Sequence, residues 1–298
     1  MILPRHLATV ALAAAVALAP APVRAWGDEG HEVVALIAYR HLTQVARGKV
    51  DALLQADTDT LTRPDIASRA TWADRYRDSD RSTTHVRYDL THAWHFVDIE
   101  LDHPDLSAAC FDHPAAATPV SHGPANACVA DRIDAFSAEL RQLKASDPER
   151  TLAFRFLLHF VGDVHQPLHA ADHDDKGGNS VHVLFGQHRV GQPLHAYWDT
   201  DVVERLGTDP MKVAATVERR FGTKCSGWMH GTPADWAMES FGIARDVVYQ
   251  LGSATTDAHG APAFELTAKY QSRAGTVAAQ QLEKAGCRLA LLLNTALR

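Results

Sequence analysis

The chain has 298 residues, of which 46% are hydrophobic, so it is long enough to bury a substantial core. Its formal net charge of -7 argues against a protein that binds nucleic acid through a broad basic surface, although bound cations can reverse the charge locally. The 18 histidines are unusually many, and their positions must decide which of them carry chemistry.

The first 25 residues have the pattern of a secretory signal. Arg5 precedes an apolar run over residues 7–18, and small residues precede a cleavage point between Ala25 and Trp26. Cleavage would also remove Arg24, which leaves 273 residues with a formal charge of -9. No second apolar segment approaches the roughly 20 residues that a membrane-spanning helix needs. We therefore expect a soluble periplasmic or secreted chain that forms no stable association with a membrane.

The N-terminal half predicts helices. Apolar residues recur with helical spacing after His31, and residues 64–77 predict a second helix with a proline in its first turn. Residues 129–144 predict an amphipathic helix. Asp147 then provides a cap for a strongly apolar helix that should run to about residue 164.

The C-terminal half predicts more helices and one small hairpin. Residues 180–190 alternate in polarity, and a Gly-Gln pair at 186–187 could form the turn. Helical patterns resume near His195 and at 211–221, 234–250 and 264–298. The predicted fold class is therefore all-α, a single mainly helical domain with at most a small β-hairpin.

Four cysteines in an exported chain favour two disulfides over a thiolate metal site. Three pairings are possible, and proximity in the sequence favours Cys110 with Cys128 and Cys225 with Cys287. The first pair would pin residues 101–128, a loop rich in proline, histidine and alanine.

Two His-x3-Asp pairs are the first candidates for chemistry. His159 and Asp163 are one turn apart on one face of an apolar helix, so both should be buried. A buried pair of this kind is either hydrogen-bonded within the helical bundle or bound to a metal ion. His195 and Asp199 repeat the spacing at another helix, and this repetition favours a metal.

Further candidates lie on both sides of these pairs. His169 follows a proline break after Asp163, which lets it turn back toward the same cavity, while Asp74 and His95 lie upstream beside apolar residues. Cleavage would also give Trp26 a free amino group beside its carbonyl oxygen, a chelate that the precursor lacks. Trp26 could alternatively be only an apolar anchor.

The candidate ligands number nine and include no cysteine: Trp26, His31, Asp74, His95, His159, Asp163, His169, His195 and Asp199. Nitrogen and oxygen donors of this kind suit zinc and leave manganese or another divalent ion open. Nine ligands with one bridging carboxylate suffice for three ions. Eight other histidines lie in expected loops or on strand faces, where we expect surface or hydrogen-bonding roles: His92, His103, His113, His122, His173, His182, His188 and His230.

These stretches resemble the zinc-dependent, single-strand-preferring nucleases of fungi, plants and bacteria, the S-one/P-one nucleases. The resemblance extends from the predicted new terminus to about residue 200. The matching motifs are Trp-Gly-x-x-Gly-His at 26–31, Trp-Ala-Asp at 72–74, His-Phe-Val-Asp at 95–98, His-Phe-Val-Gly-Asp-Val-His-Gln-Pro-Leu-His at 159–169, Gly-Gly-Asn at 177–179 and His-x-x-Trp-Asp at 195–199. The longest motif is highly specific, whereas Gly-Gly-Asn alone is weak.

The resemblance implies a nuclease domain over residues 26–298 that holds three zinc ions per chain. One ion would be held by Asp74, His95, His159 and Asp163. A second would be held by His169, His195 and Asp199. The third would be held by the amino nitrogen and carbonyl oxygen of Trp26, by His31 and by a bridging Asp163.

The resemblance also implies residues that bind substrate. Phe96 and Asp98 would contact the base of a bound nucleotide, and Asn179 would bind substrate near the zinc ions. Arg77 stands where family members often have a lysine that contacts phosphate, and its planar guanidinium changes the geometry of that contact. Phe96 could instead be a core residue.

The implied reaction is hydrolysis of single-stranded DNA and RNA, with 3'-nucleotidase activity as a further possibility in the family. Zinc lowers the pKa of a bound water to about 7, and paired ions can clamp the attacking and leaving oxygens. Asp163, Asp74 and Arg77 are the expected catalytic residues. A base that stacks on Phe96 must be unpaired, so single strands should be preferred, and we expect a monomer.

Two other functions stay open from the sequence. A zinc-dependent phospholipase C is similar in fold, in its metal cluster and in a processed N-terminal tryptophan. The spacing of Trp26 and His31 disfavours it, as does Asp199 where that class tends to have a glutamate. A periplasmic zinc-binding protein would also explain the many histidines.

Overall fold

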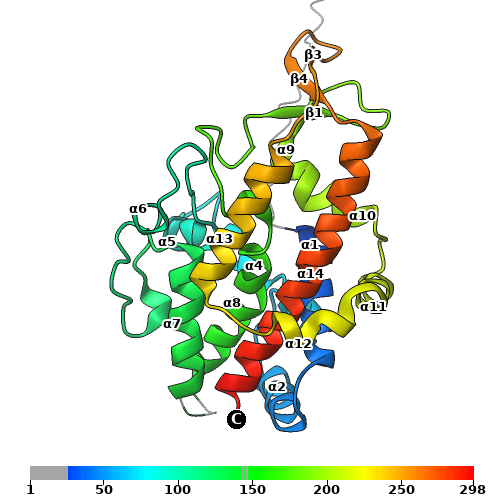
Figure 1. Ribbon diagram of the computed structural model, residues 1–298. Coiled ribbons are helices and arrows are strands. Elements are labelled where there is room, and N and C mark those ends of the chain that lie inside the picture. The colour runs from blue at the N-terminus through cyan, green and yellow to red at the C-terminus, as the bar shows by residue number, and fades with distance from the viewer. Residues whose placement is uncertain (1–25, 143, 145–146) are drawn as a thin grey trace, which may run out of the picture.

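The computed structural model describes residues 26–142, 144 and 147–298, and the predicted signal segment lies outside these residues. Helices form the body of the molecule, and a small sheet lies at one end of it (Figure 1). This arrangement confirms the predicted mainly helical fold. Two long helices, α8 (Pro148–Asp163) and α14 (Ala268–Ala296), run through the centre of the view and pack against each other.

The helix α8 has a capped N-terminus and an apolar body. The Asp147 side chain accepts a hydrogen bond from the Glu149 amide at 3.0 Å, and Pro148 occupies the first turn, as the sequence predicts. Phe156 stacks on Phe136 of α7 (Val129–Gln142), with ring centroids 4.7 Å apart. This packing fixes the helix whose last turn carries the predicted ligands.

The first helix, α1 (Gly27–Arg40), packs against α14 and α11 (Pro210–Phe221). Its apolar face, which the helical spacing predicts, is fully buried at Val33, Val34 and Ile37. The backbones approach closely at Gly286 of α14, where an added Cβ would lie 2.5 Å from Ile37 Cγ2.

The predicted single helix over residues 64–77 is wrong, because the structure divides it into α3 (Ile66–Arg69) and α4 (Trp72–Asp78). The interruption turns the carbonyl of Ala70 away from a helical bond, and the Nδ1 of His159 donates to it at 2.7 Å. A contact with α8, a distant segment of the chain, therefore decides this break.

The other helical segments are mostly short. The α-helices are α2 (Gln44–Ala56), α5 (Val86–Thr91), α6 (Leu106–Ala109), α9 (Leu194–Ala196), α10 (Val202–Glu204), α12 (Cys225–Trp228) and α13 (Pro233–Ile243). The 3-10 helices are η1 (His92–His95), η2 (Val120–His122), η3 (Pro167–His169) and η5 (Gly222–Lys224), and the π-helices are η4 (Tyr197–Asp201) and η6 (Ala244–Val248). The helix predicted over residues 234–250 is thus divided into α13 and η6.

The sheet has four short strands in the order β2-β1-β4-β3. They are β1 (His182–Leu184), β2 (Gln192–Pro193), β3 (Ala254–Thr256) and β4 (Pro262–Glu265). The predicted hairpin over residues 180–190 is only partly correct, because β1 lies within this range but its antiparallel partner β2 follows it. The sheet is also larger than the predicted hairpin, since β4 joins β1 in parallel, with Val183 opposite Phe264. The helix predicted from residue 264 therefore begins at Ala268, where Thr267 caps it.

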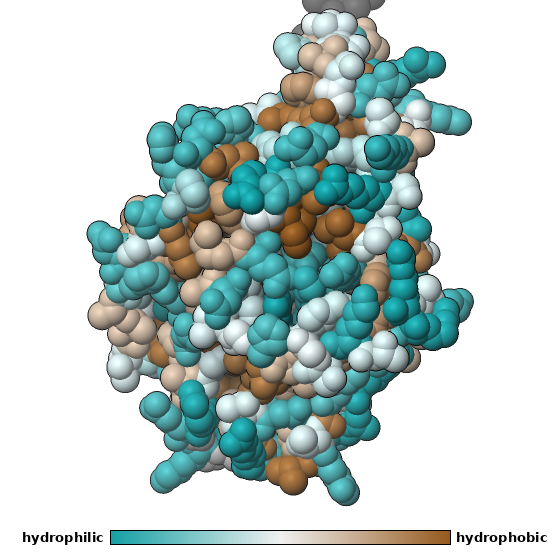
Figure 2. Space-filling view, viewed as in Figure 1, coloured by the Kyte–Doolittle hydropathy of each residue, from teal (hydrophilic) through white to brown (hydrophobic). Residues whose placement is uncertain are grey.

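Hydrophilic residues cover most of the face seen in Figure 2, and hydrophobic residues are visible mainly between them. Among the described residues, no helix has both the length and the apolar character that a membrane crossing requires.

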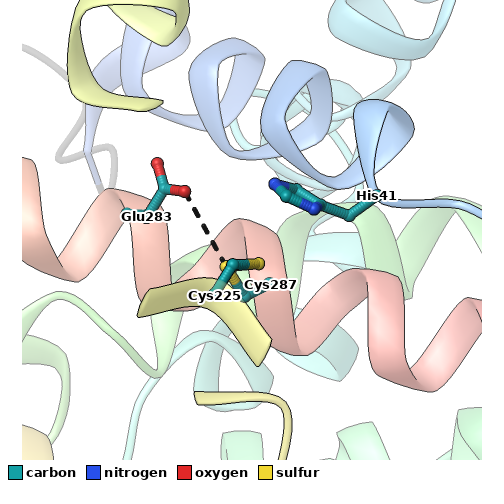
Figure 3. A group of neighbouring side chains, drawn as sticks. All are labelled: His41, Cys225, Glu283 and Cys287. Carbon is teal, nitrogen blue, oxygen red and sulfur yellow. Dashed lines mark hydrogen bonds between the residues drawn. A yellow bond between two sulfur atoms is a disulfide. The ribbon is translucent and has the colours of Figure 1, made fainter. Parts of the chain in front are cut away.

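Both disulfides have the predicted pairing, Cys110 with Cys128 and Cys225 with Cys287. The second joins α12 to α14, and His41 and Glu283 lie next to it (Figure 3). The four side chains include potential metal ligands, but both sulfurs are consumed by the disulfide bond, so this group offers no thiolate.

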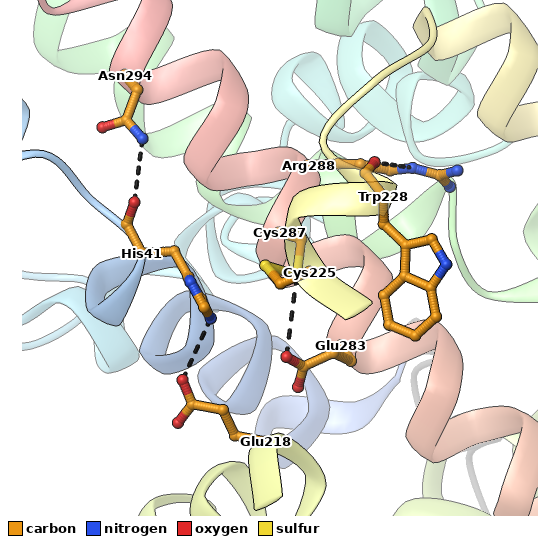
Figure 4. The surroundings of a disulfide bond; sticks show 8 residues. All are labelled: His41, Glu218, Cys225, Trp228, Glu283, Cys287, Arg288 and Asn294. Atoms are coloured by element: carbon orange, nitrogen blue, oxygen red, sulfur yellow. Dashed lines mark hydrogen bonds and ion pairs between the residues drawn. A yellow bond between two sulfur atoms is a disulfide. The ribbon is translucent and has the colours of Figure 1, made fainter. Parts of the chain in front are cut away.

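Glu283 is a buried carboxyl group beside this disulfide (Figure 4). Its side chain has no exposed surface, and its Oε1 lies 3.9 Å from the Sγ of Cys287. Burial, followed by the negative charge of Glu218, raises the pKa of Glu283 to about 7, although Arg40 acts in the opposite direction.

We expect Glu283→Gln to stabilise the protein at pH 8 but not at pH 4.5. The folded-state pKa lies above the ordinary value of 4.5, so folding becomes less favourable as the pH rises from 4.5 to about 7. The neutral glutamine removes this cost, which amounts to up to about 3 kcal/mol at 1.4 kcal/mol per pH unit. Urea unfolding of both proteins across this pH range measures the difference.

Glu265→Gln is the matched control, because Glu265 is an exposed carboxylate on β4. Its effect on the free energy of unfolding should be small at every pH. An equal gain for Glu283→Gln at pH 4.5 and pH 8 would contradict a raised pKa of Glu283 in the folded state.

Candidate metal centre

The structure brings eight predicted ligand side chains into three buried groups. The groups are His31, His159 and Asp163; Asp74, His95 and His159; and His169, His195 and Asp199. Within each group the potential ligand atoms all lie within 4.8 Å of one another. These residues come from α1, α4, η1, α8, η3, α9 and η4, so helices distant in sequence converge on one region.

Asp163 lies between two of the groups. Its Oδ1 is 3.4 Å from the Nε2 of His31, while its Oδ2 is 3.0 Å from the Nδ1 of His95 and 3.4 Å from the Nε2 of His159. The two carboxylate oxygens thus face different histidines. This is the geometry that a bridging carboxylate requires.

Backbone carbonyls orient three of the imidazoles. The Nδ1 atoms of His159, His169 and His195 lie 2.7, 2.8 and 2.6 Å from the carbonyl oxygens of Ala70, His95 and Gly177. A protonated Nδ1 that donates to a carbonyl leaves Nε2 with a lone pair for a metal. Each carbonyl is available because the chain leaves regular secondary structure at that point.

In the group of His169, His195 and Asp199, the buried side-chain amide of Gln166 also holds the carboxylate in place. Gln166 donates to Oδ1 of Asp199 at 2.6 Å, while the Nε2 of His195 lies 3.2 Å from Oδ2 of the same carboxylate and 3.1 Å from the Nε2 of His169. Two imidazole nitrogens that face each other this closely would be satisfied by a shared metal ion.

The chemistry of these groups fits bound cations. Within the described residues, the Nε2 of His159, Oδ1 of Asp163 and Oδ2 of Asp199 are buried and make no hydrogen bond, although imidazole nitrogens and carboxylate oxygens lie within 3.2 to 3.4 Å of one another. Burial disfavours a charged His159, but Asp163 and Asp74 outweigh it and raise the pKa of His159 to about 9. A positive charge is thus stabilised here even without metal, and a metal ion must displace that proton.

Trp26 is held beside these groups by its side chain. Its indole is fully buried, and Nε1 donates a 2.9 Å hydrogen bond to the carbonyl of Gly162, next to Asp163. The carbonyl of Trp26 accepts a hydrogen bond from the Gly30 amide at 3.0 Å and retains a second lone pair. Trp26 is therefore an apolar anchor in the structure, and its main chain begins the helix that carries His31.

A cleft of about 440 Å³ opens beside the buried groups. All four predicted substrate-binding residues line it, together with three predicted ligands: Arg77, Phe96, Asp98 and Asn179 with His95, His169 and His195. Phe96 is partly exposed in this cleft, which argues against the alternative of a core residue. Partial enclosure and the negative charges of Asp172 and Glu100 raise the pKa of Asp98 to about 7.

Arg77 has partners within the protein as well as a place in the cleft. Its Nη1 lies 2.7 Å from Oδ1 of Asp74, and its Nε and Nη2 bind the Asp78 carboxylate at 2.9 and 3.0 Å. Burial opposes its charge, but Asp74 and Asp78 hold the pKa of Arg77 above its ordinary value. Arg77 thus positions a predicted metal ligand in addition to facing the cleft.

The sequence motifs missed several residues of this cleft. Arg81, Tyr88, His92 and Lys176 also line it. They belong to none of the motifs, and His92 was expected to have only a surface role. The four-residue spacing of Tyr88, His92 and Phe96 was no usable signal, because Tyr88 lies in α5, His92 in η1 and Phe96 in the extended backbone after η1.

A helical body that encloses adjoining imidazole and carboxylate groups beside a cleft is typical of multi-metal hydrolases. The chain matches the model of the S1/P1 Nuclease family over residues 26–298, and it belongs to this family. The resemblance seen in the sequence is thereby confirmed.

Named relatives agree with this membership. Nuclease S1 of Aspergillus oryzae is 26% identical over 90% of this chain and 91% of its own length. Nuclease P1 of Penicillium citrinum is 25% identical over 90% of this chain and 97% of its own length. Endonuclease 2 of Arabidopsis thaliana is 29% identical over 63% of this chain, and that match spans 59% of the plant protein.

Gly162 gives a direct test of the group that contains His31. An added Cβ would lie 2.7 Å from the Nδ1 of His31, whose ring stacks on His159 with centroids 3.7 Å apart. We expect Gly162→Ala to displace His31 and to weaken one metal site by roughly tenfold or more, as other changes to the support of a ligand do. Metal content after dialysis against a weak chelator measures the loss.

Gly48→Ala is the matched control, since Gly48 lies in α2 with nothing within 4 Å of its added Cβ. It should keep the metal content of the unmodified protein. Full metal content in Gly162→Ala would contradict the expectation that a clash with His31 weakens a metal site.

Proposed function

We propose that this protein is a zinc-dependent endonuclease that hydrolyses single-stranded DNA and RNA to 5'-nucleotides. The proposal extends to 3'-nucleotides as substrates and to zinc as the metal. One observation carries it: eight buried imidazole and carboxylate ligands converge beside a cleft that all four expected substrate-binding residues line. Membership of the S1/P1 nuclease family supports it.

Three zinc ions would be held as the resemblance implies. Asp74, His95 and His159 would bind one ion with Asp163, and His169, His195 and Asp199 would bind another. Trp26 and His31 would bind the third together with Asp163, after removal of the signal segment. Zinc supplies a water of lowered pKa and stabilises charge on the phosphoryl oxygens.

The protein's own residues prepare this chemistry. Asp163 presents one oxygen to each of two groups, so it sets their separation. Arg77 holds Asp74 through a 2.7 Å ion pair and places a positive charge beside the cleft. The partly exposed Phe96 offers a ring face to an unpaired base, which is the basis for a preference for single strands.

A cationic centre also explains how an acidic protein could bind a polyanionic substrate. The formal charge of the full sequence is -7, and three divalent ions would add +6 at one place. The cleft would then attract phosphate locally while the rest of the surface stays acidic. Because the positive charge would be concentrated at the metal centre, we expect phosphate contacts near that centre and not over a broad basic surface.

The two rival functions are separated by simple assays. A zinc-dependent phospholipase C would release the headgroup of a choline lipid and leave single-stranded DNA intact, whereas our proposal predicts the reverse. A zinc-storage protein would bind zinc without turnover of either substrate. The named relatives are nucleases, which favours the first of the three functions.

Asp163→Asn is expected to abolish hydrolysis. The amide removes a negative charge that faces two ligand groups, so both metal sites should be disturbed together. A loss of several kcal/mol of transition-state stabilisation corresponds to a fall in kcat/KM of about a thousandfold or more. Cleavage of single-stranded DNA, measured beside zinc content, checks this.

Asp246→Asn serves as the control, because Asp246 is 61% exposed and pairs with the neighbouring Arg245. Its turnover should match that of the unmodified protein. Retained hydrolysis in Asp163→Asn would count against the metal cluster.

The terminal amino group is tested by one added residue. A protein that begins with Ala25 in front of Trp26 lacks the amine beside the Trp26 carbonyl, so its third metal site should be weaker. Zinc titration of this form and of a form that begins at Trp26, each verified by N-terminal sequencing, compares the two. Equal zinc stoichiometry and affinity would overturn the role of the amine.

A further inference from the structure

One wall of the cleft carries a row of neighbouring aromatic rings with an arginine at its end. The Tyr88 and His92 rings are stacked, with centroids 4.9 Å apart and planes 16° apart, and the His92 and Phe96 rings form a T-shaped pair with centroids 5.4 Å apart. The guanidinium of Arg81 lies over the Tyr88 ring at 4.8 Å from its centroid. All four residues line the same cleft.

This row does not serve the hydrophobic core. Thr91 is the only buried residue of α5, the short helix that carries Tyr88. His92 is exposed, and Tyr88 and Phe96 are half-buried. Tyr88 covers one face of the His92 ring, and the exposure of His92 leaves ring surface open to the cleft, where a base can stack without regard to sequence.

The charge beside the row suits a phosphate. Arg81 is 44% exposed, and its ion pair with Asp78 is long, at 3.9 Å. The same Asp78 carboxylate accepts two shorter hydrogen bonds from Arg77, at 2.9 and 3.0 Å. Arg81 can therefore turn to a phosphate without leaving Asp78 unpaired.

We propose that Arg81, Tyr88 and His92 form a second nucleotide subsite, for an unpaired nucleotide that flanks the one at Phe96. The flanking base stacks on His92, whose ring Tyr88 supports from its other side, and Arg81 pairs with the adjoining phosphate. This inference rests on the proposed nuclease function and adds a reason for a preference for strands over mononucleotides. Tyr88 acts as a positioning residue in this arrangement.

An abasic scan tests the subsite on the zinc-loaded protein. The substrates are a short single strand of thymidylates and matched strands in which each position in turn lacks its base. We expect one flanking position at which loss of the base lowers kcat/KM by about five- to a hundredfold, the range that stacking of one base provides. In His92→Ala that penalty should fall to about twofold or less.

Two variants separate stacking from a structural role. His92→Phe keeps a ring face and should keep the penalty, whereas a merely structural histidine would not be rescued by phenylalanine. His182→Ala is the control, because His182 is an exposed histidine on β1 outside the cleft, and it should also keep the penalty.

Arg81→Gln reports on the phosphate contact separately. It should keep the abasic penalty but reduce the slope of log binding affinity against log salt by about 0.7, the value for one phosphate of a single strand.

Three results would overturn the inference. The first is a wild-type protein with no penalty at any flanking position, and the second is a full penalty in His92→Ala. The third is failure to cleave any strand, including the unmodified one, while lipid headgroup is released or no substrate turns over. That last result would overturn the nuclease function itself, whereas the first two leave it intact.

Discussion

The structure depends on the burial of the Asp163 carboxylate at the end of an apolar helix. An ionised carboxylate is costly to bury unless positive charge and hydrogen-bond donors surround it. His31, His95 and His159 supply those partners at 3.0 to 3.4 Å. Aromatic packing holds α8 against α7, and His31 and His95 reach the carboxylate from α1 and η1.

Much of the hydrogen bonding that orients the predicted ligands comes from backbone carbonyls at points where helices are interrupted. The break after α3 presents the Ala70 carbonyl to His159, and the turn at Gly177 presents a carbonyl to His195. Gly177 has a φ of 59°, and an added Cβ there would lie 2.8 Å from the Leu168 carbonyl. Features that look like irregularities of the fold therefore orient the imidazoles.

The cleft combines two kinds of recognition on one wall. Charge is concentrated at the proposed metal centre and at Arg77 and Arg81, while ring faces line the wall from Tyr88 to Phe96. Phosphates and unpaired bases alternate along a single strand, so a cleft with both elements suits that substrate better than a duplex whose bases are hidden. An acidic protein can therefore be selective for an acidic polymer.

The sequence by itself determined the candidate ligand types and the cap of α8, because each depends on residue chemistry within a short segment. Asp147, for example, caps the helix within two residues of its own position. The sequence only favoured the disulfide partners among three pairings, since Cys225 and Cys287 are 62 residues apart. Only the tertiary structure decided the break at Ala70, the parallel pairing of Val183 with Phe264 and the row of rings beside Phe96. The first two depend on contacts between segments far apart in the chain. The third depends on how α5, η1 and the extended Phe96 are arranged beside the cleft.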